Sequence, residues 1–195
     1  PITTDPVNYG ALLTNGVAVT NNFQFSVSGT VGNNFDAVLS IQDGTNNLGT
    51  IPFTFRIGPP PPILMSEDFS SITTGDNTST SGSSSAWSGN TNFPTVSAAY
   101  QAGGATRLGT SKAAGSITSR ALDLSGNGGV FSVQFDVKGW STVEGSIRVT
   151  AGSLSPQTVT YTATLSGTYQ NKFVNFTGGQ ANSTVKIETT AGRAF

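Results

Sequence analysis

The chain has 195 residues, of which 10% are charged, and its formal net charge is −1. The nine Lys and Arg residues form no basic surplus, so we expect no nucleic-acid partner. Because His and Cys are absent, catalytic sites of the Ser-His-Asp and Cys-His types, zinc sites that use His, and disulfides are all excluded.

Residues 1–58 carry the period-two alternation of strands that have one buried face. In "NNFQFSV" Phe23 and Phe25 alternate with polar residues, and a longer alternating run begins at Phe35 and ends at an Asp-Gly turn. "LGTIPFTFRIG" adds a further strand, and its Pro52 favours an edge position because proline lacks the backbone N–H. A complete sandwich usually has about seven strands. The expected count is about four, so we predict an incomplete β-sandwich domain.

Residues 59–62 are four consecutive prolines. Proline runs adopt polyproline II, which advances about 3.1 Å per residue, so the segment predicts a semi-rigid spacer of roughly 12 Å. The alternative is an ordered loop inside a single domain. With the spacer, the predicted fold class is all-β, with two β-sandwich domains held apart.

Residues 63–195 form the second predicted domain. "ILMSEDFSS" is its expected first strand, and residues 73–92 form a long polar loop around Trp87. Short strands with Gly, Ser or Asn between them then recur at spacings of about 10 to 14 residues, which is typical of a jelly-roll-like sandwich. In "VFSVQFDVKGW" the positions expected to face solvent are Ser132, Gln134, Asp136 and Lys138.

Calcium is the metal that the residues could hold, because it needs only oxygen ligands. Glu67 and Asp68 open the second domain, and Asp76 in the polar loop could complete the site. The alternative is that these acids are solvated residues at the start of a strand. No other cofactor is expected.

Exposed aromatic rings are the usual platform for sugars, which stack an apolar face on them. Trp87 and Tyr100 lie in or near the polar loop and are the candidates for carbohydrate binding. The alternative for Trp87 is an anchor that fixes the loop to the domain. We predict no catalytic residue, because a solvated outer face explains strand acids such as Asp136 and Glu144.

Three segments of the second domain, "RLGTSKAAGSITSRALDLSG", "VFSVQFDVKGWSTVEGSIRVT" and "STVKIETTAGRAF", together resemble a β-sandwich accessory module of secreted and surface proteins of the Bacteroidetes. The resemblance covers roughly residues 67–195, without the acidic final strand that follows "RAF" in such modules. "FDAVLSIQDGTNNLGTIPFTFRIG" resembles the end of an immunoglobulin-like repeat. The resemblance implies a non-catalytic role and carries over no ligand.

The expected function is therefore that of an accessory, adhesive or structural module of a larger bacterial protein, secreted or anchored at the cell surface. One alternative is a carbohydrate-binding module of an exported hydrolase. Another is a filament subunit that assembles by strand exchange through open sheet edges. The expected partners are a glycan, another surface protein or a second copy, and no stretch of 18 apolar residues predicts a membrane span.

Overall fold

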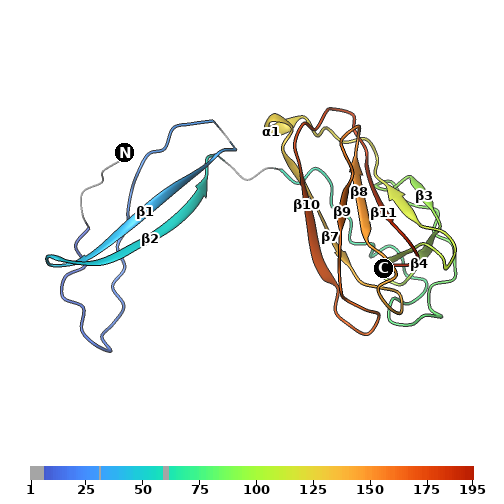
Figure 1. The fold of residues 1–195 in the computed structure, drawn as a ribbon, viewed down its shortest axis with the longest axis horizontal. Helices are drawn as coiled ribbons and strands as arrows, with labels where there is room; N and C mark the ends of the chain where they lie inside the picture. The colour runs from blue at the N-terminus through green and yellow to red at the C-terminus, as the bar shows by residue number, and fades with distance from the viewer. Residues whose placement is uncertain (1–6, 31, 59–61) are drawn as a thin grey trace. The chain divides into compact units, whose positions relative to one another are not determined.

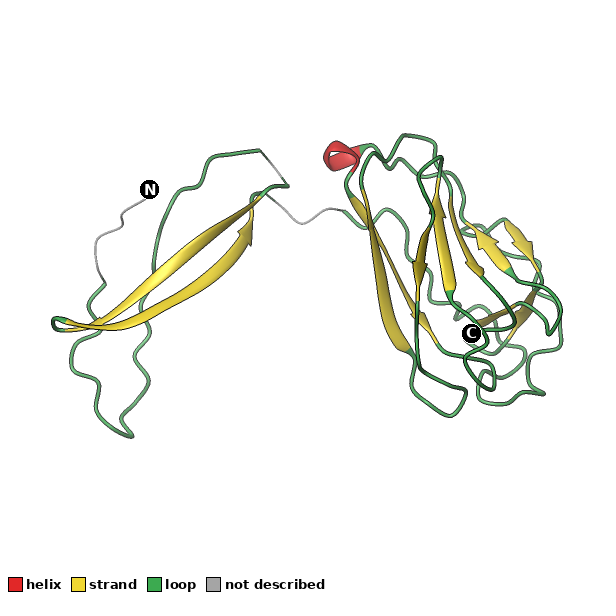
Figure 2. Cartoon of the chain, in the orientation of Figure 1, coloured by secondary structure: helices red, strands yellow, loops and turns green. Residues whose placement is uncertain are grey.

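The computed structural model describes residues 7–30, 32–58 and 62–195 (Figure 1). These residues fold almost entirely as antiparallel β-structure, which confirms the predicted all-β class (Figure 2). The single helical element among them, α1 (Gly126–Gly129), is a four-residue turn in which Asn127 and Gly128 have left-handed φ angles of 54° and 66°. No helix in the described ranges is long and apolar enough to span a membrane.

The chain divides into two compact units, residues 1–60 and 61–195. The division falls inside the proline run. Residues 59–61 of the predicted spacer lie outside the described residues. We therefore describe each unit by itself.

The described residues of unit 1 form one antiparallel hairpin, β1 (Asn34–Asp43) and β2 (Asn46–Arg56). Phe35 lies opposite Phe55. Every second residue of each strand points to the same face, and most of the apolar residues share one face, as the sequence predicted. β2 pairs only with β1 in the described residues, so Pro52 does lie in an edge strand.

The prediction of about four strands in the first 57 residues is wrong, because the described part of unit 1 contains two. "NNFQFSV" forms no strand there. Its Phe25 ring instead lies 5.9 Å from the ring of Phe35 and 6.0 Å from that of Phe55. The alternation therefore arises from side chains that cover the hairpin, and not from backbone pairing.

The elements of unit 2 in chain order are β3 (Thr95–Ser97), β4 (Ala99–Gln101), β5 (Thr106–Leu108), β6 (Ser116–Thr118), α1, β7 (Phe131–Val137), β8 (Ile147–Ala151), β9 (Gln157–Val159), β10 (Gln170–Phe176) and β11 (Val185–Thr189). Five of the strands form an antiparallel sheet in the order β3-β6-β11-β8-β9, and the others form the pairs β10-β7 and β4-β5. The five-stranded sheet and the β10-β7 pair enclose the larger hydrophobic core, to which Val137, Val149, Phe176 and Val185 contribute.

The segment "ILMSEDFSS", which we predicted to be the first strand of the second domain, forms no strand in the described structure. Glu67 and Asp68 accept hydrogen bonds from the backbone N–H groups of Phe69 and Ser70, each two residues further on. Phe69 has a left-handed φ of 56°. Local turns of this kind compete with an extended strand and explain the error.

The C-terminal residues pair inside unit 2. Ala194 forms bridges with Leu108 and Gly139, and the backbone N–H and carbonyl of Phe195 bond those of Lys138. Lys138, which we expected to face solvent, is therefore only 3% exposed. The alternation of β7 ends at Val137, and the chain then turns inward to meet the C-terminus.

Candidate functional site

Trp87 lies in a second hydrophobic core, and its side chain is 8% exposed. Its ring meets that of Phe69 edge-on at 5.6 Å, and its backbone N–H donates to the carbonyl of Ala99 at 2.9 Å. A ring enclosed in this way has no free face to offer a sugar. The placement favours the loop anchor over the stacking platform.

Tyr100 is half-buried in β4, and Arg107 lies opposite it in β5. The Arg107 guanidinium carbon sits 3.9 Å from the centre of the Tyr100 ring, so one face of that ring is already covered. Trp140 is covered in the same way by Arg193, whose guanidinium carbon is 3.6 Å from the ring centre. We call these four residues the arginine–aromatic stack.

Glu144 holds the stack in place. Its carboxylate accepts the Arg193 side-chain N–H groups at 2.7 and 3.1 Å and the Arg193 backbone N–H at 2.9 Å. The hydrogen bonds from the Arg193 guanidinium lower the pKa of Glu144 below its ordinary value of 4.5. These contacts identify the stack as a structural clamp between the segment before β8 and the C-terminus.

The ion pair between Glu144 and Arg193 should make the stability of unit 2 sensitive to acid. Because the pKa of Glu144 is lower in the folded state, its stabilisation is fully present above pH 4.5 and is lost as the pH falls through the folded pKa. Glu144→Gln should cost about 1–2 kcal/mol at neutral pH and should flatten the decline below pH 4.5. Urea unfolding at several pH values would measure both effects.

Arg193→Gln is the matched control for this prediction. If the pH dependence belongs to the ion pair, Arg193→Gln and the double variant should show the same reduced slope as Glu144→Gln. A slope equal to that of the wild type in all three variants would assign the acid sensitivity to other carboxyl groups.

The three predicted calcium ligands do not form a cluster. The Glu67 Oε2 atom accepts the side-chain N–H groups of Asn90 and Asn92 at 2.8 and 3.0 Å. Asp68 and Asp76 each accept a backbone N–H two residues further on. The Ser70 N–H is the main cause that lowers the pKa of Asp68, and the Thr78 hydroxyl, which also donates to Asp76, is the main cause that lowers the pKa of Asp76. No group of three or more acids that could hold a metal occurs in the described ranges. Calcium binding stays a prediction, and the amide donors occupy the Glu67 lone pairs that a cation would use.

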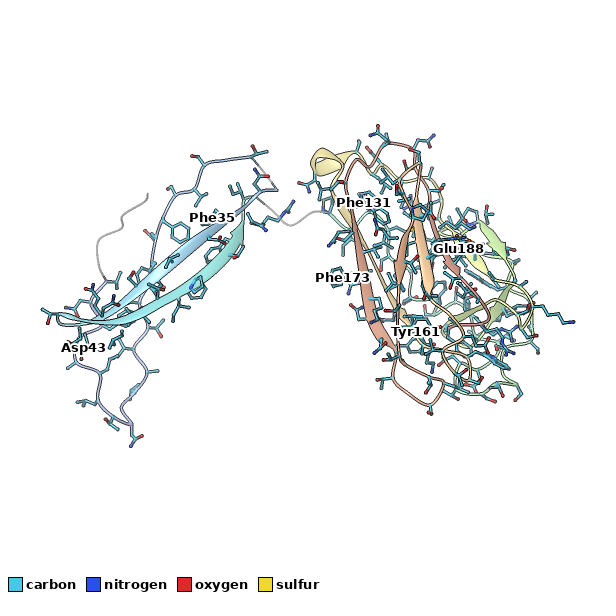
Figure 3. All side chains as sticks on the ribbon, viewed as in Figure 1. Phe35, Asp43, Phe131, Tyr161, Phe173 and Glu188 are labelled. Carbon is cyan, nitrogen blue, oxygen red and sulfur yellow. The ribbon has the colours of Figure 1, made fainter. Side chains whose placement is uncertain are left out.

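The outer face of the β7-β10 pair offers a different surface. Phe173 in β10 is 64% exposed and projects from the strand, away from the core (Figure 3). The strand register places polar side chains around it, and we call the six residues the Phe173 face. They are Ser132, Gln134, Asp136, Asn171, Phe173 and Asn175.

Hydrogen bonds fix the polar side chains of the Phe173 face. Gln134 Nε2 donates to Asn171 Oδ1 at 2.9 Å, and Asn171 Nδ2 donates to Asp136 Oδ1 at 2.8 Å. Ser132 Oγ donates to Asn175 Oδ1 at 2.6 Å. Within the described part of the chain, these bonds leave the Gln134 Oε1 acceptor and the Asn175 Nδ2 donor without protein partners. Oriented donors and acceptors thus flank an exposed ring.

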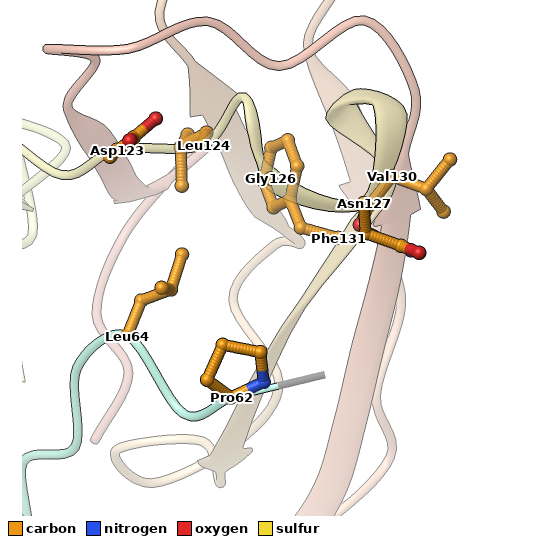
Figure 4. A pocket seen from close by; sticks show the side chains of 8 residues that line it. All are labelled: Pro62, Leu64, Asp123, Leu124, Gly126, Asn127, Val130 and Phe131. Atoms are coloured by element: carbon orange, nitrogen blue, oxygen red, sulfur yellow. The ribbon is translucent and has the colours of Figure 1, made fainter. Parts of the chain in front are cut away.

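Figure 4 shows the pocket beside α1, which Leu64, Leu124 and Phe131 help to line. It holds about 70 Å³, whereas ligand sites commonly span roughly 300–1,000 Å³. The pocket is therefore too small for a sugar or a cofactor, and the exposed faces are the better candidates.

No protein family, curated protein or solved structure matches the chain. Phe173 is not among the candidates named from the sequence, because "QNKFVNF" carries polar residues on both sides of the strand, Gln170 and Lys172 on one and Asn171 and Asn175 on the other.

Proposed function

We propose that the chain is a non-catalytic, adhesive accessory module of a larger bacterial protein, secreted or anchored at the cell surface, and that unit 2 binds carbohydrate through the Phe173 face. The observation that carries the proposal is the exposure of Phe173 between side chains fixed by hydrogen bonds. We further propose that unit 2 is a jelly-roll sandwich and unit 1 part of an immunoglobulin-like domain, joined by the proline spacer.

The chemistry of the Phe173 face suits a sugar. A pyranose has an apolar face of C–H groups that stacks on an aromatic ring, and a rim of hydroxyl groups that both donate and accept hydrogen bonds. Gln134 Oε1 can accept from a hydroxyl, and Asn175 Nδ2 can donate to one. Asp136 is the single acid on the face, and its carboxylate accepts a hydrogen bond from Asn171. Because its negative charge repels anions, the face favours neutral sugars over strongly anionic ones.

A glycan array with the purified chain tests this proposal. Phe173→Ala should weaken binding to the best glycan by about tenfold, because aromatic stacking contributes roughly 0.5–1.5 kcal/mol beyond the area it buries. Asn175→Ala should weaken it by a smaller factor, since it removes one hydrogen bond. Titration calorimetry with that glycan would measure both changes.

Val143→Ala is the matched control. Val143 is also an exposed apolar residue, at 37%, and it lies between β7 and β8, off the Phe173 face. This variant should bind like the wild type. The proposal is overturned if the wild type binds no glycan, or if Phe173→Ala and Val143→Ala bind equally well.

A further inference from the structure

Within the described residues, one side of the unit 1 hairpin is covered only in part. Strand pairing places seven apolar residues on this side, which we call the hairpin face: Phe35, Ala37, Leu39, Ile41, Ile51, Phe53 and Phe55. Of these, Ile51, Phe53 and Phe55 in β2 are still 44%, 45% and 43% exposed. Soluble domains rarely leave such a continuous apolar patch without a partner.

The hairpin also needs a second layer on the hairpin face to be stable. A two-stranded hairpin is marginally stable in water at best, and it gains stability when its apolar face packs against another element. Within the described residues, Phe25 covers only part of the face, through its contacts with the rings of Phe35 and Phe55. Phe25 itself is 43% exposed, so this cover is thin.

The composition of the hairpin face indicates what packs there. None of its seven residues is charged, so two copies of it can meet without like-charge repulsion. The opposite face carries Asp36, which accepts a hydrogen bond from the Thr54 hydroxyl at 2.6 Å, and this suits contact with water. The apolar face therefore complements itself, and the polar face does not.

The available area is sufficient for a dimer. If large side chains offer about 150–250 Å² each, the uncovered parts of Phe25 and the hairpin face amount to roughly 500 Å² per copy. Two copies packed face to face then bury roughly 1,000 Å², the size at which specific interfaces begin. We propose that the partner of the hairpin face is a second copy of this chain, so that two hairpins form the two layers of one small sandwich.

Sedimentation of the full chain across a concentration series tests the dimer. The wild type should pass from monomer to dimer in the micromolar range or above. Phe53→Asp should weaken the dimer by at least roughly 100-fold, because it places an unpaired carboxylate in the apolar interface. Val38→Asp is the matched control: Val38 is 61% exposed, it pairs with Pro52 on the opposite face, and its substitution should leave the dimer intact.

Cysteine cross-linking provides a second readout that does not depend on an acid in the hairpin face. The chain contains no Cys, so a single introduced thiol reports one position. Mild oxidation should cross-link Phe53→Cys into covalent dimers far faster than Val38→Cys. The proposal is overturned if the wild type stays monomeric at every concentration, if Val38→Asp weakens the dimer as much as Phe53→Asp, or if both thiols cross-link equally.

Discussion

Gly109→Ala should destabilise unit 2 by about 3–5 kcal/mol, a large part of the roughly 5–15 kcal/mol that holds a domain together. Gly109 has a left-handed φ of +86°, and a Cβ atom there would overlap the carbonyl oxygen of Gly192. The obstacle is backbone, so no side-chain rotation can relieve it. Urea unfolding followed by tryptophan fluorescence reports on unit 2 specifically, since both Trp residues, Trp87 and Trp140, lie there.

Gly104→Ala separates the two causes of this expected loss. Gly104 also has a left-handed φ, of +71°, but a Cβ there would meet no atom within 4 Å. Its substitution should cost only about 1–2 kcal/mol, the strain of placing an L-residue in that conformation. Equal losses in the two variants would show that backbone strain, and not the contact with Gly192, decides the stability at Gly109.

The close contact between Gly109 and Gly192 explains why glycine occurs at these positions of two sequence motifs. Gly109 and Gly115 lie in "RLGTSKAAGSIT", and Gly192 lies in "TTAGRAF". Thr189 joins the two segments, because its hydroxyl oxygen accepts the Gly115 N–H at 2.9 Å and its hydroxyl donates to the Gly192 carbonyl at 3.2 Å. Glycine is required where two backbones approach so closely, because any other residue would place a Cβ atom in the contact.

The sequence predicted those parts of the fold that depend on local alternation. β1, β2 and β7 lie where the period of two placed them, and the expected apolar residues share one face of each strand, although those of β2 stay exposed. It failed where distant segments decide the outcome. The backbone of Lys138 pairs with that of the C-terminal Phe195, and its ammonium group lies 4.6 Å from the centre of the Tyr169 ring. The residue is therefore buried, and burial lowers the pKa of the ammonium group. A pattern read over a few residues cannot contain a contact 57 positions away.

The residues of the candidate site also depend on contacts that the local sequence does not show. The sequence singled out aromatic residues in or near the polar loop, yet Trp87 belongs to a core and Tyr100 is covered by Arg107. Loop composition does not reveal which rings are buried, because burial depends on the elements against which a loop packs. The period of two in β10 places Phe173 between Asn171 and Asn175, but Gln170 and Lys172 lie on the other side, so periodicity alone does not show which side faces outward.

Trp87→Ala should lower the stability of unit 2 by about 3–5 kcal/mol, the usual cost of deleting a large aromatic side chain from a core. It should also speed amide hydrogen exchange in residues 73–92, because the ring that packs the loop against Phe69 and Phe93 is lost. Thermal unfolding followed by circular dichroism and exchange measured by mass spectrometry would record both effects.

Trp87→Phe is the control for this variant, since it keeps an aromatic ring in the core and should recover most of the stability. The carbohydrate measurement then distinguishes anchor from platform. An anchor at Trp87 requires that the folded Trp87→Ala protein, measured well below its melting temperature, retain the glycan affinity that depends on Phe173. If Trp87→Ala instead keeps its stability and loses glycan binding, the sugar stacks on Trp87. The loop around it would then have to open on binding, since the side chain is only 8% exposed in the closed arrangement.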